Sequence, residues 1–310
     1  MSSIVGLESI LSLIDVQPPY YALQNLFIDD HHAAYASIEV EQSLGKEAGP
    51  ISSGEIGRHL AILGSCSVAS LNPVKSKHYY LASKAVLRRN PAVRQGGTAT
   101  RHKLYGVAAG KMISGKSAAA SCYIQDHTGH ILYYLEVMYH VVKEETFKRA
   151  NRKFQMQNIF HDASPNPYKH LLPLRNIEKS IPLVKAELGM IEPAWCYGHF
   201  AELPVLPIAR LMSQLIQTAG IHAAHLHGDD EITFQVLSGN AQADQLAFAG
   251  DHIQVQSELT YARDEIYWFD CKAVSNGSKV VGQVYVELKV MPAAALTSSA
   301  YEQDKLLLHS

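Results

Sequence analysis

The residues best suited to chemistry stand in one short segment, Gly198-His199-Phe200, which is followed by Pro204 and Pro207. Directly after Pro207 the apolar residues recur at helical spacing, which predicts a helix over residues 208–220. A neutral imidazole such as that of His199 is suited to act as a base near neutral pH. The first turn of a helix offers free N–H groups and a positive dipole end, which stabilise developing negative charge. The segment therefore predicts acid–base chemistry at the start of a helix.

This segment resembles the FabA/FabZ family of hydroxyacyl-thioester dehydratases. The loop of that family reads G-H-F-P-G-x-P-x-x-P-G, and its helix carries an acidic residue six positions after the second proline. Residues 198–207 here read G-H-F-A-E-L-P-V-L-P, and the similarity covers roughly residues 166–292 and, more weakly, the first half. The resemblance implies a hotdog fold, an antiparallel sheet wrapped around a central helix. It also implies a substrate carried by acyl carrier protein or coenzyme A, and no metal or redox cofactor.

The sequence departs from the family pattern at four positions. Ala201 and Glu202 replace the Pro-Gly pair, Ile208 replaces the glycine at the helix start, and Ser213 stands where the family has its acid. By itself, the second half of the chain therefore lacks the acid of the family's reaction.

The first half supplies part of what is missing. Aligning residues 50–54, which read Pro-Ile-Ser-Ser-Gly, with the family's P-x-x-P-G places Gly54 at the helix-start glycine and His59 at the acid's position. No histidine precedes Pro50 in a G-H-F-like loop. In hotdog dimers of this family each site is shared across the interface. The resemblance therefore implies one composite site, in which His199 faces the helix that begins at Gly54.

In that composite site, His199 is expected to remove the proton α to the thioester carbonyl. Gly54 and Gly198 are expected to bind the carbonyl, because a missing side chain lets it approach backbone N–H groups. His59, as an imidazolium, is expected to protonate the departing β-hydroxyl, and Glu55 lies four residues earlier, where it favours the charged ring. For both His199 and His59, a buried and partnered histidine without a catalytic role is the alternative interpretation.

Other candidate residues have simpler interpretations. Cys196 adjoins the loop, but no base is predicted beside it, so a buried thiol is expected rather than a nucleophile. The four cysteines contain no C-x-x-C pair and are expected to be reduced. His222, His225 and His227 are predicted to lie in the loop after the helix, where a solvated polar turn is favoured over a metal site. No metal is therefore expected.

The chain repeats its pattern at an interval of 148 residues. Pro19-Tyr20 and Pro167-Tyr168 open similar stretches, and the turn glycines Gly129 and Gly277 are separated by the same interval. In each half an alternating strand precedes a helical segment, and several strand-like runs follow. The predicted strands cover residues 34–41 and 182–191, and the predicted helices cover residues 54–64 and 208–220. One helix followed by an antiparallel meander, occurring twice, predicts an α+β double hotdog.

Length and composition agree with two domains. The chain has 310 residues, of which 47% are apolar and 18% charged, as expected for globular domains with sizeable cores. Residues 147–167 are polar and lose periodicity, so the boundary is predicted near residue 155, between an N-terminal hotdog of residues 1–155 and a C-terminal hotdog of residues 156–310.

The charge balance of 27 basic against 29 acidic residues does not favour nucleic acid or an anionic membrane as a partner. No apolar run approaches 18 residues, and Glu8 lies where a signal peptide carries basic residues. We therefore expect a cytoplasmic protein, with a homodimer as one possible assembly.

The function predicted from the resemblance is dehydration of a 3-hydroxyacyl thioester, carried by acyl carrier protein or coenzyme A, in fatty-acid or polyketide-type metabolism. Two alternatives remain open at this point. The first is hydrolysis of an acyl thioester, which the hotdog fold also supports. The second is a non-catalytic acyl-binding subunit. The identity of the group facing His199 distinguishes the three.

Overall fold

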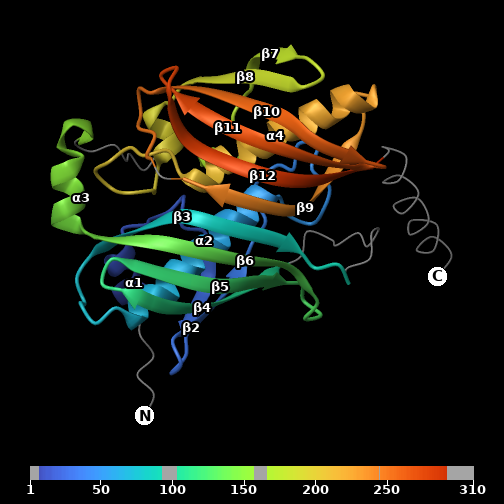
Figure 1. The fold of residues 1–310 in the computed structure, drawn as a ribbon. Helices are drawn as coiled ribbons and strands as arrows, with labels where there is room; N and C mark the ends of the chain where they lie inside the picture. The colour runs from blue at the N-terminus through green and yellow to red at the C-terminus, as the bar shows by residue number, and fades with distance from the viewer. Residues whose placement is uncertain (1–6, 93–102, 157–165, 244, 292–310) are drawn as a thin grey trace.

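The computed structural model describes residues 7–92, 103–156, 166–243 and 245–291, which form two similar halves (Figure 1). The first half contains α1 (Leu7–Ile14), β1 (Leu23–Ile28), β2 (Ala33–Ile38), α2 (Ser53–Leu71), β3 (His78–Arg89), β4 (Leu104–Ser114), β5 (Ser117–Gln125) and β6 (Ile131–Lys143). The second half contains β7 (Arg175–Lys179), β8 (Leu183–Met190), α4 (Ile208–His227), β9 (Thr233–Gln242), β10 (His252–Arg263), β11 (Ile266–Ser275) and β12 (Lys279–Met291). Between β6 and β7 the chain forms α3 (Glu144–Ala150) and the short 3₁₀ turns Arg152–Phe154 and Pro167–Lys169, and a third 3₁₀ turn, Pro193–Cys196, lies between β8 and α4.

The strands form one antiparallel sheet in the order β1-β2-β4-β5-β6-β3-β9-β12-β11-β10-β8-β7. The order of the second half mirrors that of the first about the β3–β9 pair, as expected for two copies of one fold related by a two-fold axis. β3 and β9 pair from Lys84 with Gln242 to Arg88 with Ser238. The predicted double hotdog with joined sheets is therefore confirmed.

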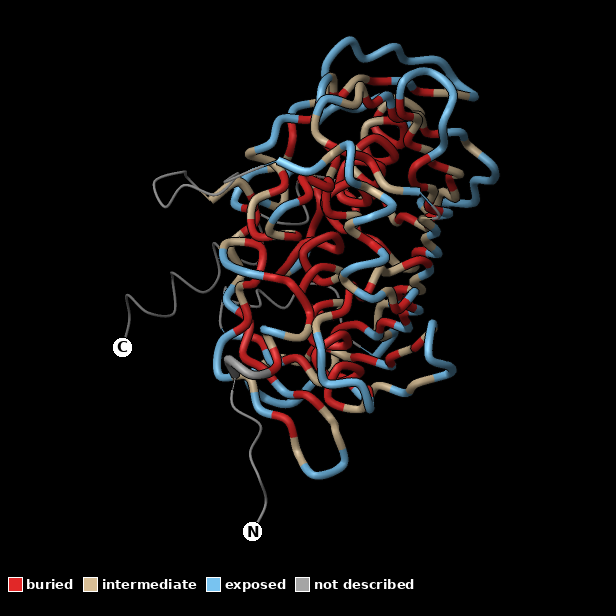
Figure 2. The backbone as a smooth tube through the Cα atoms, turned by 90° about the vertical axis from the view of Figure 1, so that its left-hand side faces the viewer, coloured by how far each residue is buried: buried red, intermediate tan, exposed pale blue. Residues whose placement is uncertain are grey.

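Alternation of side chains along the strands sets the inner and outer faces of the sheet. In β6, Leu135, Val137 and Tyr139 are buried, whereas the intervening Glu136 and Met138 are exposed. Successive side chains of a strand point to opposite faces, so the buried series faces the helix that the sheet encloses. Most buried apolar residues of both halves belong to one large hydrophobic cluster, and a second, smaller cluster contains Tyr79, Phe147, Phe200, Leu203, Val205 and Phe248. Figure 2 shows the buried residues running through the length of the molecule.

Each half encloses one long helix, α2 or α4, in the concave face of its sheet. α2 is buried nearly all round, which explains why its sequence shows little amphipathic contrast. Its start is defined by Ser52, whose side-chain oxygen accepts a hydrogen bond from the Glu55 N–H. The end of α4 is defined by Gly228, which has φ +73° and adopts the left-handed conformation typical of a helix C-cap.

The two helices meet at Gly54 and Ser213. A Cβ atom added to Gly54 would lie 1.7 Å from Ser213 Oγ and 2.8 Å from Ser213 Cβ. A side chain at position 54 therefore cannot coexist with Ser213 in this arrangement, and the glycine sets how closely α2 approaches α4.

Both central helices extend beyond the predicted segments, to Leu71 and to His227. The prediction that His222, His225 and His227 lie in a loop is therefore wrong, because the apolar face of α4 continues through Ala219, Ala223 and Ala224. His222 is buried and its ring nitrogens lie 2.8 Å from the Ile181 carbonyl oxygen and 3.3 Å from Ser257 Oγ.

The polar stretch between the halves begins with α3 and a 3₁₀ turn rather than with irregular chain. Residues 157–165 lie outside the described residues, so the domain boundary near residue 155 stays a prediction. No helix in the described part of the chain is long and apolar enough to span a membrane. Within the described ranges, no three histidine, cysteine or acidic side chains gather closely enough to hold a metal ion.

The Gly54–Ser213 contact generates a testable prediction. We expect Gly54→Ala to destabilise the protein by about 1–3 kcal/mol, because overpacking a tight contact forces the helices apart. Ser213→Gly removes both close atoms and should recover most of that loss in the double variant. Chemical denaturation of the four proteins of this cycle measures the coupling. Additive effects in the double variant would show that the two residues do not oppose each other.

Candidate active site

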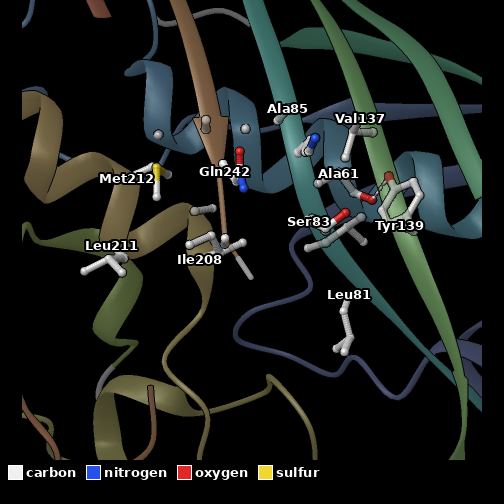
Figure 3. Close-up of a pocket in the computed structure, with 18 of the residues that line it drawn as sticks. Ala61, Leu81, Ser83, Ala85, Val137, Tyr139, Ile208, Leu211, Met212 and Gln242 are labelled. Carbon is white, nitrogen blue, oxygen red and sulfur yellow. Dashed lines mark hydrogen bonds between the residues drawn. The ribbon is translucent and has the colours of Figure 1, made fainter. Parts of the chain in front are cut away.

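A cavity of about 210 Å³ lies between α2, α4 and the β3–β9 pair. One water needs only roughly 15 Å³ by this kind of measure, so the cavity has room for a small organic ligand. Its wall is predominantly apolar, and residues of both halves line it (Figure 3). His199 and Gly54, which come from different halves of the sequence, both line this cavity.

The hydrogen bond of His199 fixes the tautomer of its ring. Nδ1 lies 3.0 Å from the Val205 carbonyl oxygen. Because a carbonyl oxygen can only accept, Nδ1 carries the proton, and Nε2 of the neutral ring keeps its lone pair. The ring packs against Phe200 at 3.9 Å and against Tyr20 at 4.8 Å between centroids. His199 is therefore held in a fixed orientation with Nε2 available as a base.

Burial keeps His199 neutral. Its desolvation lowers the pKa of the imidazole to about 4, and this effect outweighs the Val205 hydrogen bond and the Asp15 charge, which favour the protonated ring. At neutral pH the ring is therefore in the form that accepts a proton. The imidazolium that forms on accepting a proton is a strong acid in this environment, so it returns the proton readily.

A strap formed by residues 15–20 of the first half holds the His199 loop. The Gln17 N–H donates to the Gly198 carbonyl oxygen at 2.8 Å, and the Phe200 N–H donates to the Asp15 carbonyl oxygen at 3.3 Å. Gly198 has φ +78°, and a Cβ added there would lie 2.3 Å from the Gln17 carbonyl oxygen. Gly198 packs against the strap and is absent from the described residues that line the cavity. The strap leaves no room for a side chain at position 198, which explains the glycine there. The predicted role of Gly198 in binding the carbonyl stays a prediction.

Gly54 presents its backbone to the cavity. The neighbouring N–H groups at the start of α2 are bonded, that of Ser53 to Glu47 Oε1 at 2.8 Å and that of Glu55 to Ser52 Oγ at 3.2 Å. The Gly54 N–H donates to none of the described residues. A free N–H at a helix N-terminus is suited to bind a carbonyl oxygen on which negative charge develops.

His59 and Glu55 form the predicted pair one helical turn apart, with Nε2 of His59 3.5 Å from Glu55 Oε1. Both are fully enclosed by protein, and neither occurs among the described residues that line the cavity. Burial and the neighbouring Arg58 lower the pKa of His59, against the raising effect of Glu55. Arg58 Nη2 lies 3.1 Å from His59 Nε2 and donates to it. The structure thus places a neutral, buried His59 within α2 and away from the cavity lining, and this geometry does not support its predicted role as an acid.

Two residues near His199 were not identified from the sequence. Tyr20 lines the cavity beside the His199 ring, and burial raises the pKa of its phenol to about 12, so it stays protonated. Asp15 is buried, forms an ion pair with Lys77 at 2.5 Å and accepts from the Ala201 N–H at 3.4 Å. The repeated Pro-Tyr dipeptide could have pointed to Tyr20 as a site residue, whereas no local sequence pattern indicates Asp15.

No carboxylate occurs among the described residues that line the cavity. Several polar side chains there are already bonded to backbone, as Tyr139 is to the Ala61 carbonyl oxygen at 2.7 Å (Figure 3). Cys196 is buried and unpaired, and burial raises the pKa of its thiol to about 12, as expected for a structural cysteine. Lys84, His140 and His199 are the basic side chains among the described residues that line the cavity. The first two are solvent-exposed, whereas burial keeps the ring of His199 neutral.

Comparison with known proteins gives sequence and fold relatives. A 3-hydroxyacyl-[acyl-carrier-protein] dehydratase FabZ of Geotalea uraniireducens is 24% identical over 165 residues, which cover 52% of this chain and 97% of that protein. An acyl-CoA thioesterase II TesB2 from Mycobacterium marinum has a TM-score of 0.50 at 13% identity, covering 93% of this chain and all of that one. A hot dog fold protein from Alicyclobacillus acidocaldarius has a TM-score of 0.53 at 8% identity, covering 89% and 99%. No family model matches the chain.

These likenesses agree with the architecture. The chain has the hotdog fold and is similar in sequence to FabZ dehydratases.

The lowered pKa of His199 predicts how stability depends on pH. Between pH 6.5 and about 4 the unfolded state binds a proton that the folded state does not, so acidification through this window destabilises the protein. The full shift corresponds to up to about 3 kcal/mol. His199→Asn keeps an amide donor for Val205 and should flatten the dependence over this window. Denaturant melts at several pH values test this, and parallel curves for both proteins would contradict it.

Proposed function

We propose that this protein is an acyl-thioester enzyme that dehydrates a 3-hydroxyacyl thioester. The observation that carries the proposal is the presence of His199 and the free Gly54 N–H on one apolar cavity. A base and a hydrogen-bond donor on one apolar site are what removal of a proton α to a carbonyl requires. The similarity to the FabZ of Geotalea uraniireducens, a 3-hydroxyacyl-[acyl-carrier-protein] dehydratase, supports the same reaction.

In the proposed reaction, the thioester carbonyl oxygen accepts a hydrogen bond from the Gly54 N–H at the positive end of α2. His199 Nε2 takes the α-proton, and the electron pair of the C–H bond moves toward the carbonyl as an enolate. The enolate then expels the β-hydroxyl group and forms the α,β double bond. The departing oxygen takes a proton from the His199 imidazolium and leaves as water. One histidine therefore supplies both proton transfers, and the products are the enoyl thioester and one water molecule.

Because burial holds the His199 pKa near 4, the base is weak but its conjugate acid is strong. This favours the second proton transfer, in which the leaving hydroxyl needs a good donor. The first transfer then depends on stabilisation of the enolate oxygen by the Gly54 N–H. The Tyr20 phenol lies beside the His199 ring, and because burial raises its pKa to about 12 it would act as a hydrogen-bond donor rather than as a second acid.

Hydrolysis of an acyl thioester is the second candidate. The fold likeness to the acyl-CoA thioesterase II TesB2 and the lack of a carboxylate among the described cavity-lining residues favour it. In that reaction His199 would accept a proton from a water molecule that attacks the carbonyl. Acyl carrier protein or coenzyme A as the carrier, a homodimeric assembly and a cytoplasmic location remain predictions.

The reaction is tested by incubating the protein with 3-hydroxyacyl and enoyl thioesters and following the products by mass spectrometry. We expect interconversion of the two thioesters, and a loss of at least about 10³-fold in kcat/KM for His199→Asn, because the base is removed. Release of free thiol with an unchanged acyl chain would identify a thioesterase. Binding without either product would favour the non-catalytic acyl-binding subunit.

His59→Gln separates the predicted acid from a structural residue. Because His59 does not line the cavity, we expect kcat to stay within about tenfold of the wild type while the melting temperature falls, since the buried ring loses its packing and the Arg58 contact. If kcat instead falls by about 10²–10⁴-fold with an unchanged melting temperature, His59 is the acid that the family alignment indicated.

A further inference from the structure

The cavity extends into both halves of the molecule. The lining residues fall into two groups, and the part of the cavity beside each group is called an arm. The first arm is lined from α2 and the first-half sheet by residues that include Ala61, Val137 and Tyr139. The other arm lies between α4 and the second-half sheet, where Met212, Val236 and Val284 form its wall. In Figure 3 the side chains of Leu211 and Met212 lie on one side of Gln242, and those of Ala61, Val137 and Tyr139 lie on the other. Gly54 and His199 also line this cavity.

The arm beside α4 contains no base of its own. The described residues that α4, β9 and β12 contribute to it from positions 208–216, 236–239 and 281–284 are all apolar. An apolar interior normally packs to high density, because unfilled space forfeits dispersion contacts. An apolar arm that stays hollow without a base of its own is suited to hold part of a ligand that reacts elsewhere in the same cavity.

Glycines add space to each arm. A Cβ added to Gly57, in the interior of α2, meets no atom within 4 Å. A Cβ added to Gly239, in β9, has only Val284 Cγ2 nearby, at 3.7 Å. Neither residue has positive φ, and Gly is unfavourable inside helices and strands. Both glycines line the cavity, so the room that they leave belongs to it.

We propose that the substrate is a branched acyl thioester whose two apolar branches occupy the two arms. This inference rests on the proposed function. The reacting carbons must lie at His199, from which one chain extends from the β-carbon and a second extends as an alkyl group on the α-carbon. The α-carbon keeps one hydrogen, the proton that His199 removes. A 2-alkyl-3-hydroxyacyl thioester is therefore the substrate class that fits both arms.

Burial of the second branch should increase affinity for such a ligand. Each methylene moved from water into an apolar site strengthens binding by about fourfold. A linear acyl chain of the same main-chain length leaves one arm unfilled. A four-carbon α-branch should therefore strengthen binding by roughly tenfold or more, even when part of this gain is lost on ordering the chain.

The test compares linear and 2-butyl acyl chains of equal main-chain length, each joined to coenzyme A through a non-cleavable thioether ketone, by isothermal titration calorimetry on the full chain. We expect the branched ligand to bind at least about tenfold more tightly to the wild type. Ala61→Leu in one arm and Gly239→Val in the other should each reduce this preference to threefold or less. Gly115→Val, at a position in the β4–β5 turn where an added Cβ meets nothing within 4 Å, is the matched control and should retain the preference.

Equal binding of both ligands to the wild type would overturn the two-branch proposal, and it would leave the proposed thioester chemistry standing. Loss of the preference in only one arm variant, with the other unchanged, would show that one arm alone is used and would also overturn it. Failure of both ligands to bind would refute the proposed function together with this inference. Thermal melts identify a misfolded variant. If a variant misfolds, the comparison of the two ligands on the wild-type protein still tests the two-branch proposal.

Discussion

The contact between the two halves, made by the β3–β9 strand pair and by the close approach of α2 and α4, is the constraint on which the candidate site depends. Five residue pairs join β3 to β9, and Gly54 lies against Ser213 where the helices meet. Only this arrangement brings the His199 loop of one half to the same cavity as the α2 N-terminus of the other. Gly54 thus has a packing role, and its N–H group has no hydrogen-bond partner among the described residues.

The two halves have diverged in the loops that precede their central helices. In the second half, residues 198–200 carry the histidine and are fastened by the strap of residues 15–20. In the first half, the corresponding loop supports the start of α2. Glu47 accepts from the Ser53 N–H, and Glu55 accepts from the N–H groups of Glu41 and Gln42. One loop therefore presents a base, and the other holds the helix that supplies the donor.

Burial governs the charge state of this region. Desolvation lowers the pKa of His199 to about 4 and raises that of Glu47 to about 7. In both cases the neutral form is favoured, because an ion loses its hydration on transfer into the protein. Arg58 remains paired with Glu41 beside α2, away from the cavity lining. The lining of the cavity is predominantly apolar, and it includes the neutral ring of His199 and the backbone of Gly54.

Much of the architecture was predictable from the sequence alone. The 148-residue repeat, the helical and alternating periodicities and the G-H-F loop with its two prolines together indicated a double hotdog with His199 at a helix start, because these signals are local in the chain. The lengths of the helices were underestimated, since the buried continuation of α4 through His222 lacks a strong pattern. Only the tertiary structure decided which side chains share the cavity. His59 and Glu55 do not line the cavity with His199, because the direction in which a helical side chain points depends on how the helix packs. Tyr20 and Asp15 lie near His199, because the strap that carries them packs against a loop far away in the sequence.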